Sequence, residues 1–318
     1  AIETSKLTKC FGDTRAVDSI DLAIPRGTVY GLLGPNGAGK TTTIRMLTTL
    51  LKPDSGKAMV LGHDLMTEAA DIRAKVGVTG QFASVDEDLT GFENLVLVAR
   101  LLGFSWRGAR DRARQLLDGF DLTEFAKRQA RTYSGGMRRR LDIAASLIVT
   151  SELLFLDEPT TGLDPRSRGQ VWDIVRAIAA AGTTVLLTTQ YLEEADKLAD
   201  RLAVIDHGKL IAEGTSNELK ASVGGRALHL TLNDASQRDA AEAIIKQLLG
   251  EVHHGAEGNK LSAKVLRDEA VPQALAALAA ANINIAEFAL AQPSLDDVFF
   301  ALTGKPVESN DTETKVTA

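Results

Sequence analysis

The sequence predicts an α/β protein with a parallel central sheet, followed by a smaller α+β domain. Through residues 28–199, short apolar strand patterns alternate with helical patterns, which is typical of a parallel sheet covered by helices on both faces. A Gly-rich loop at residues 34–42 joins one of these strands to a helix. The strand and helix patterns restart near residue 226, after a Gly-rich linker, and this restart predicts the second domain.

The first domain, predicted at residues 1–222, begins with a small antiparallel layer. Its strands are expected at residues 2–7, 16–24 and 28–33, separated by "FGDT" and "PRG", which carry turn residues. Further strands lie in "VYGLLG", "KVGVTGQ", "ELLFLDEP" and "TTVLLTTQ", and helices are expected at 40–50, 166–181 and 193–199. Residues 82–151 show helical periodicity and predict a helical insertion. Two strands joined by a turn at 206–208 close the domain.

The second domain is predicted at residues 223–304. Strands are expected in "ALHLTL", "KLSAKVL" and "INIAEFAL", with helices at 236–249, 269–280 and 294–302. This is an α+β pattern for which a ferredoxin-like arrangement is one option. Residues 305–318 are polar and lack aromatic side chains, which predicts disorder.

The composition of the chain limits the classes of partner and the cellular locations that the protein can have. The chain has 318 residues, 44% hydrophobic and 25% charged, with a net charge of -6. It therefore offers no broad basic surface, and we expect no nucleic-acid partner. One cysteine, Cys10, cannot form an internal disulfide, and the chain start lacks a signal-peptide pattern, so the expected location is cytosolic. No apolar window looks able to cross a bilayer, so work at a membrane requires a separate membrane-spanning partner.

The segment "GPNGAGKTT" matches the phosphate-loop pattern G-x-x-x-x-G-K-[ST], after an apolar strand and before a helix. Its glycines let backbone N–H groups and the helix N-terminus point at phosphates. Lys40 is expected to contact the β- and γ-phosphates, and the Thr41 hydroxyl to bind Mg²⁺. The predicted nucleotide-binding residues of the loop are Gly34, Pro35, Asn36, Gly37, Ala38, Gly39, Lys40, Thr41 and Thr42.

Two further segments complete the expected site. In "LLFLDEP" an apolar strand ends in two carboxylates, of which Asp157 is expected to hold Mg²⁺ and Glu158 to orient and deprotonate the attacking water. In "YSGGMRRRLDIAASLI" a Ser-Gly-Gly turn at residues 134–136 opens a helix and forms a second anion-binding N-terminus. One nucleotide does not need two such loops from the same chain.

With this signature the chain resembles the ATP-binding cassette (ABC) family over residues 2 to about 224. The resemblance implies that two copies pair head to tail, each ATP lying between one copy's phosphate loop and the partner copy's Ser134, Gly135 and Gly136. It also implies that Phe11 stacks on adenine and that Asp164 contacts the opposite copy. Gln81 then matches the loop glutamine that touches Mg²⁺. Tyr133 and Met137 depart from the usual signature without affecting its phosphate-contacting residues.

Gln190, in "LLTTQYLEEAD", stands where most relatives carry a histidine that contacts the γ-phosphate. As a neutral amide it can donate a hydrogen bond but cannot change charge near neutral pH. We expect it to sense and position the γ-phosphate; the alternative is a plain turn between strand and helix.

Several polar residues have simpler interpretations. His253 and His254 are expected in a solvated turn, since no further ligands lie at metal spacing. The run Arg138 to Arg140 is expected on a solvated or interface face of a helix. His63 and His207 lie in Gly-flanked turns and need no catalytic role.

The ending "AQPSLDDVFFALTG", together with "SGGMRRRLDIAASLI" and "DEPTTGLDPRSR", is similar to bacterial drug-export ATPases of the daunorubicin and doxorubicin resistance type. That resemblance implies an ATPase docked, as two copies, on two separately encoded permease subunits at the cytoplasmic face of the membrane. A nucleotide-gated binding module and a cytosolic ABC ATPase remain alternatives. The cargo, drug or lipid-like, and the role of the second domain stay open.

Overall fold

The computed structural model describes residues 1–80, 85–223, 226–250, 252–254, 258–265, 269–291 and 293–303. The chain divides into two compact units, Ala1–Ile211 and Ala212–Ala318. Helix α8 (Ser216–Val223) lies in the second unit, although the sequence pattern places it at the end of the first domain.

The first unit begins with a four-stranded antiparallel sheet in the order β2-β1-β4-β5. Its strands are β1 (Ile2–Phe11), β2 (Thr14–Ile24), β4 (Ser55–Val60) and β5 (His63–Asp64). The expected third strand of this layer, at residues 28–33, is wrong: β3 (Val29–Leu33) is buried along its whole length in the central sheet. The true partner β4 buries only Ala58 and Val60, so its apolar pattern is too short to predict a strand.

The central sheet has six strands in the order β10-β9-β3-β8-β7-β6, and β9, β3, β8, β7 and β6 run parallel. The further strands are β6 (Val76–Thr79), β7 (Leu153–Asp157), β8 (Thr184–Thr189), β9 (Arg201–Asp206) and β10 (Lys209–Gly214). Along β7, Leu154 and Leu156 enter one hydrophobic core while Leu153 and Phe155 enter another. Because strand side chains alternate between faces, both faces of the sheet are covered.

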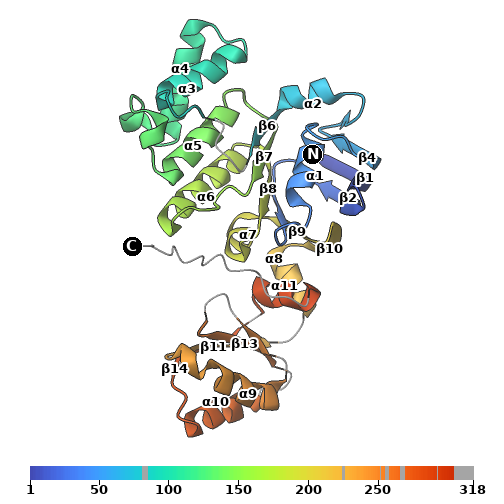
Figure 1. The fold of residues 1–318 in the computed structure, drawn as a ribbon, viewed down its shortest axis with the longest axis vertical. Helices are drawn as coiled ribbons and strands as arrows, with labels where there is room; N and C mark the ends of the chain where they lie inside the picture. Colours follow the sequence, from blue (N-terminus) through green and yellow to red (C-terminus); the bar gives the residue numbers. More distant parts are fainter. Residues whose placement is uncertain are drawn as a thin grey trace. The chain divides into compact units, whose positions relative to one another are not determined.

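The helical insertion and the antiparallel layer lie on opposite sides of the central sheet (Figure 1). The insertion contains α3 (Gly91–Leu101), α4 (Trp106–Gly119), η1 (Thr123–Phe125), η2 (Ala130–Thr132) and α5 (Gly135–Ser146). Thr90 and Glu93 form a reciprocal cap at the start of α3. The other helices of this unit are α1 (Lys40–Leu47), α2 (Ala69–Lys75), α6 (Pro165–Ala180) and α7 (Leu192–Leu198).

After α8, the second unit follows the order strand, helix, strand, strand, helix, strand, and forms an antiparallel sheet ordered β12-β13-β11-β14. This is the ferredoxin-like option. Its elements are β11 (Arg226–Leu232), α9 (Arg238–Leu249), β12 (Val252–His254), β13 (Lys260–Val265), α10 (Ala270–Ala280) and β14 (Ile285–Ala291), followed by α11 (Leu295–Thr303). The expected turn at His253 and His254 is wrong, because both lie in the three-residue strand β12.

No helix among the described residues is both long and apolar enough to span a bilayer.

Candidate active site at the carboxyl edge of the central sheet

Three neighbouring parallel strands end at the same edge of the central sheet. In the register, Leu33 of β3 stands opposite Thr189 of β8, and Asp157 of β7 stands opposite Thr188. The residues that follow these strands therefore meet, although they come from distant parts of the sequence. Ligands bind at this edge in open parallel sheets.

The loop between β3 and α1 has a shape that neighbouring backbone enforces. A Cβ atom at Gly34 would lie 2.2 Å from the Ile205 carbonyl oxygen, and one at Gly39 would lie 2.3 Å from the Ala16 carbonyl oxygen. Gly39 also has a φ of 104°, which other residues rarely adopt. The loop thus reaches α1 with the N-terminus of that helix directed at the strand edge, as a phosphate site requires.

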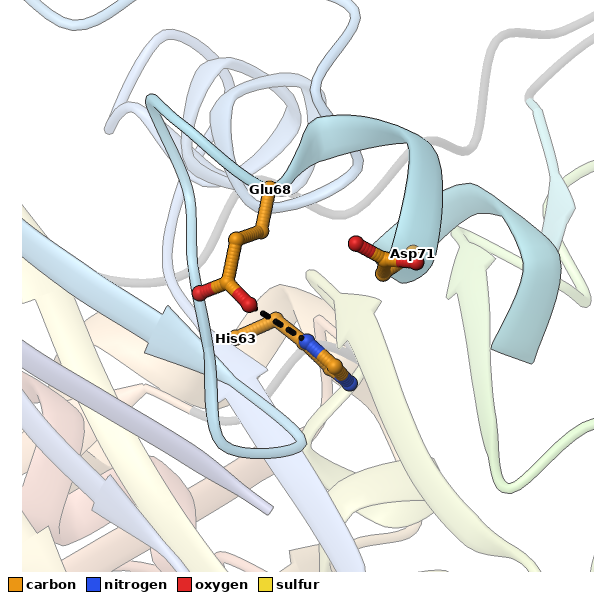
Figure 2. A group of neighbouring side chains, drawn as sticks. All are labelled: His63, Glu68 and Asp71. Carbon is orange, nitrogen blue, oxygen red and sulfur yellow. Dashed lines mark hydrogen bonds and ion pairs between the residues drawn. The ribbon is translucent and has the colours of Figure 1, made fainter.

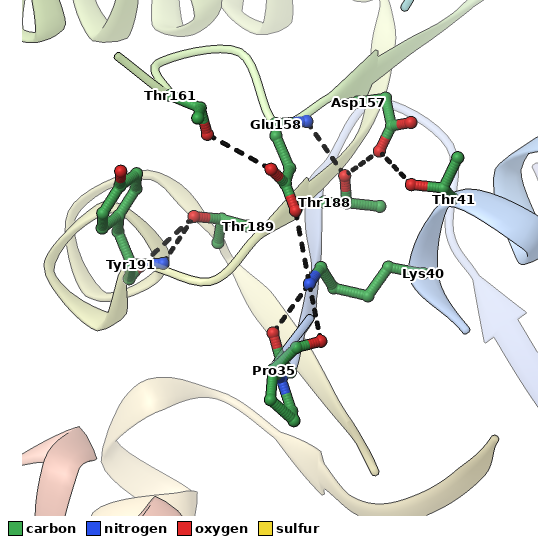
Figure 3. Close-up of polar contacts among 10 residues, drawn as sticks. Pro35, Lys40, Thr41, Asp157, Glu158, Thr161, Thr188, Thr189 and Tyr191 are labelled. Carbon is green, nitrogen blue, oxygen red and sulfur yellow. Dashed lines mark hydrogen bonds and ion pairs between the residues drawn. The ribbon is translucent and has the colours of Figure 1, made fainter. Parts of the chain in front are cut away.

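Lys40 opens α1 and is buried at 4% exposure. Its Nζ donates to the carbonyl oxygens of Gly34 at 2.8 Å and Pro35 at 3.0 Å, and lies 3.4 Å from Glu158 Oε1 (Figure 3). Burial lowers the pKa of Lys40, while the neighbouring Glu158 and Asp157 carboxylates oppose that shift. The cation is held beside the loop that would receive phosphates.

The two carboxylates after β7 make different contacts (Figure 3). Asp157 Oδ1 accepts hydrogen bonds from the hydroxyls of Thr188 at 2.6 Å and Thr41 at 3.1 Å. Glu158 has a φ of 48°, in the left-handed region, and its side chain makes contacts with Lys40 and with the Thr161 hydroxyl. The strained backbone separates the directions of two adjacent acids, so they can do different chemistry.

Gln190 lies in the connection between β8 and α7 and is 5% exposed. Because β7 and β8 are neighbours, Gln190 follows the strand beside the one that leads to Glu158. The Glu158 N–H donates to the Thr188 carbonyl at 3.2 Å and to its hydroxyl at 3.0 Å, which ties the two strand ends together. Gln190 therefore lies at the expected edge of the sheet, beside the strand that leads to Glu158. Its contact with the γ-phosphate stays a prediction.

Ser134, Asp164 and Phe11, which are further predicted nucleotide contacts, make other contacts than those of Lys40 and Glu158. Ser134 caps α5 by accepting from the Met137 N–H at 3.2 Å, and both Ser134 and Gly135 are exposed. Asp164 caps α6 in the same way through Ser167. Phe11 ends β1 with its side chain 52% exposed and Lys9 Nζ 5.7 Å from its ring centre. Gln81 lies outside the described residues.

The expectation that Arg138 to Arg140 lie on a solvated or interface face of the helix is wrong for two of the three residues. Arg138 is partly exposed and pairs with Glu87, but Arg139 and Arg140 are buried. Both precede buried residues by one helical turn, Arg139 before Ile143 and Arg140 before Ala144, and this spacing was the available signal.

Arg139 holds the backbone next to the active-site carboxylates in place. The sequence patterns did not predict this contribution. Its guanidinium donates to the carbonyl oxygens of Gly80 at 2.7 Å, Pro159 at 2.9 Å and Asp157 at 3.1 Å, and pairs with Asp142 at 3.3 Å. It therefore joins α5 to the ends of β6 and β7.

A second group of polar side chains lies away from this edge, in what we call the β5–α2 corner: His63, Glu68 and Asp71 (Figure 2). His63 Nδ1 lies 3.1 Å from Glu68 Oε1, and its Nε2 lies 2.8 Å from Lys75 Nζ. An ammonium only donates, so Nε2 accepts from Lys75 and the Nδ1–H donates to Glu68. Both ring nitrogens are thus engaged by protein groups.

Comparison with known proteins agrees with this geometry. Residues 17–161 match the ABC transporter family model, and residues 214–303 match the model "ATP-binding protein DrrA1-3-like, C-terminal domain". The ADP conformation of MJ1267, an ATP-binding cassette of an ABC transporter, aligns with a TM-score of 0.62 and 26% identity over 68% of this chain and 91% of that one. Fold and site together define an ATP-binding cassette, the ATPase of ABC transporters.

The relatives extend over both units. The daunorubicin/doxorubicin resistance ATP-binding protein DrrA of Streptomyces peucetius is 59% identical over 98% of this chain and 95% of its own length. The doxorubicin resistance ATP-binding protein DrrA of Mycobacterium tuberculosis H37Rv is 46% identical over 97% of this chain and 95% of its own. The chain belongs to this family of ABC transporter ATP-binding proteins, with a DrrA-like C-terminal domain.

Proposed function

We propose that this chain is the ATP-hydrolysing subunit of an exporter that moves a hydrophobic drug-like or lipid-like compound through a separate membrane permease. The observation that carries the proposal is the convergence of Lys40, Asp157 and Glu158 at one strand edge. The names of relatives support the cargo class, since they include daunorubicin and linearmycin resistance proteins and a Nod factor export protein.

The residues fit a bound Mg²⁺. The Thr41 hydroxyl lies 3.1 Å from Asp157 Oδ1, and both are the hard oxygen ligands that Mg²⁺ prefers. We propose that Thr41 and Asp157 hold the ion, together with Gln81. When bound, Mg²⁺ would neutralise phosphate charge during hydrolysis.

The catalytic roles follow from the contacts of Lys40 and Glu158. Lys40 Nζ donates hydrogen bonds to two carbonyl oxygens of the loop and pairs with Glu158. When ATP binds, phosphate oxygens would replace these groups as the partners of Lys40. Glu158 would then be released to accept the proton of the attacking water. Gln190 would donate a hydrogen bond to the γ-phosphate as a neutral group. The remaining loop residues, 34–39 and Thr42, would surround the phosphates.

The complete unit would contain two copies in head-to-tail arrangement on two separately encoded permease subunits, at the cytoplasmic face of the membrane. The starts of α5 and α6 are exposed at Ser134 and Asp164, which supports pairing because a second copy can reach them. Exposed Phe11 would stack on the adenine ring.

The test is co-reconstitution with the membrane protein encoded beside this chain. We expect Mg²⁺-dependent ATP hydrolysis that rises with the permease in the same vesicles, together with ATP-dependent uptake of daunorubicin into inverted vesicles. Vesicles holding the chain without the permease are the control for uptake. Hydrolysis that is indifferent to every co-encoded membrane protein would contradict the exporter proposal.

A further inference from the structure

Glu194 on α7 is a buried carboxyl group that none of the roles above uses. It is 1% exposed, and its Oε1 accepts hydrogen bonds from the Thr160 hydroxyl at 2.8 Å and from Trp172 Nε1 at 3.1 Å. These donors come from separate segments, the loop after β7 and helix α6. The Thr189 side chain also faces the carboxyl group from the end of β8. Four parts of the first unit therefore meet at one side chain.

An ionised carboxylate is costly at such depth unless charged partners surround it. Burial raises the pKa of Glu194, and the hydrogen bonds and the Arg168 guanidinium only partly oppose this shift. The Arg139 guanidinium on α5 also faces Glu194, and it already pairs with Asp142. Burial thus favours the neutral form of Glu194, whose Oε1 acts as the hydrogen-bond acceptor for Thr160 and Trp172. Its Oε2 is buried and has no hydrogen-bond partner in the described structure.

The two segments that Glu194 joins carry the proposed catalytic groups. Thr160 comes two residues after Glu158, and Thr189 comes immediately before Gln190. Thr160 is fully buried, and a buried hydroxyl needs a hydrogen-bond acceptor, which Glu194 provides. A shift of Glu194 would therefore move both segments together.

We propose that Glu194 is a positioning residue for ATP hydrolysis, whose carboxyl group sets the distance between the Glu158 loop and the Gln190 segment. The inference rests on the roles proposed for Glu158 and Gln190. Misplacement of catalytic groups by about 1 Å can lower rates by roughly 100-fold, so a buried contact of this kind is sufficient to control turnover.

The experiment measures kcat and KM for ATP on the full-length chain, with kcat expressed per ATP-binding site counted by equilibrium binding. Glu194→Ala is expected to lower kcat by about 10-fold and to leave KM within about twofold, because phosphate binding does not involve this group. Glu194→Gln keeps an acceptor oxygen in a neutral group of the same shape and should restore at least about half of the kcat.

Two further variants separate positioning from general damage. Thr160→Val removes the donor in the Glu158 loop and should lower kcat in the same direction. If both effects pass through one contact, the double variant Thr160→Val/Glu194→Ala should be no slower than Glu194→Ala alone. Glu193→Ala, on the same helix but with an exposed side chain, is the matched control and should behave like the parent chain.

The outcomes are distinct. An unchanged kcat per binding site in Glu194→Ala overturns the inference, because a merely structural role would reduce the number of folded sites without slowing each one. Equal losses in Glu194→Gln and Glu194→Ala overturn it as well. Absence of ATP hydrolysis in the parent chain would instead overturn the proposed function.

Discussion

The carboxyl edge of the central sheet and the β5–α2 corner both gather acidic groups, yet they are built in opposite ways. At the edge, Asp157 meets Thr188, 31 residues away, through strand register, and Thr41, 116 residues away, at the start of α1. In the corner, His63, Glu68 and Asp71 lie within nine consecutive positions. One grouping depends on the whole fold and the other on a local turn.

The contacts explain why only one of them suits catalysis. In the corner, Glu68 accepts from the Asp64 N–H at 2.8 Å and from His63, so its oxygens close the turn before α2. At the edge, the acids stand beside a buried cation and a helix N-terminus that can receive phosphate. An acidic cluster therefore suits catalysis when its neighbouring groups can bind a ligand. Where the carboxylates instead satisfy groups of the same turn, as in the β5–α2 corner, they only stabilise the fold.

The largest contrast is expected from removing one carboxylate in each region. Glu158→Gln should lower ATP hydrolysis by at least about 100-fold while ATP binding persists, because a neutral amide cannot accept the proton of water. Glu68→Gln in the corner should hydrolyse ATP at the parent rate. Phosphate release at saturating ATP is the measurement, and undiminished turnover in Glu158→Gln would remove Glu158 from the mechanism.

A smaller loss is expected at Gln190. Gln190→Ala should lower kcat by about 10- to 100-fold, as for loss of one hydrogen-bond donor to a developing charge. Gln190→His should remain active, since imidazole also donates. Steady-state kinetics of both variants decide the point, and an alanine variant with the parent kcat would reduce this position to a turn between β8 and α7.

The smallest effect concerns metal affinity. Asp157→Asn should raise the Mg²⁺ concentration needed for half-maximal hydrolysis by about 10-fold, since a neutral ligand replaces an anionic one. Asp71→Asn should leave that concentration unchanged. Titration of MgCl₂ at fixed ATP gives both values. An equal response of the two variants would show that Asp157 has no greater part in Mg²⁺ binding than Asp71.

Much of the edge could be predicted because its residues belong to continuous sequence patterns. The loop at 34–42 and the pair Asp157 and Glu158 each follow an apolar strand, and parallel strands bring their ends together whatever their separation in sequence. The position of Gln190 followed from the same argument. The central sheet, the helical insertion and the second α+β unit were predictable for this reason as well.

Other features could not be predicted, because they depend on contacts between distant segments or on strands too short to show a period. Strands β4 and β12 bury few apolar residues. Arg139 and Glu194 look like ordinary charged residues of helices, and only the fold shows that carbonyl oxygens or buried donors surround them. Charge in the sequence predicts exposure by default, and buried charge at functional sites is where that default fails.

The guanidinium of Arg139 also has a consequence for the order of folding. Two of its three carbonyl acceptors, at Asp157 and Pro159, are synthesised after α5, and the third, at Gly80, comes 59 residues earlier. Before β7 joins β6, only the Gly80 acceptor is in place, so Arg139 can make its full set of contacts only when both strands are present. We therefore expect docking of the first turns of α5 to coincide with closure of the long β6–β7 crossover.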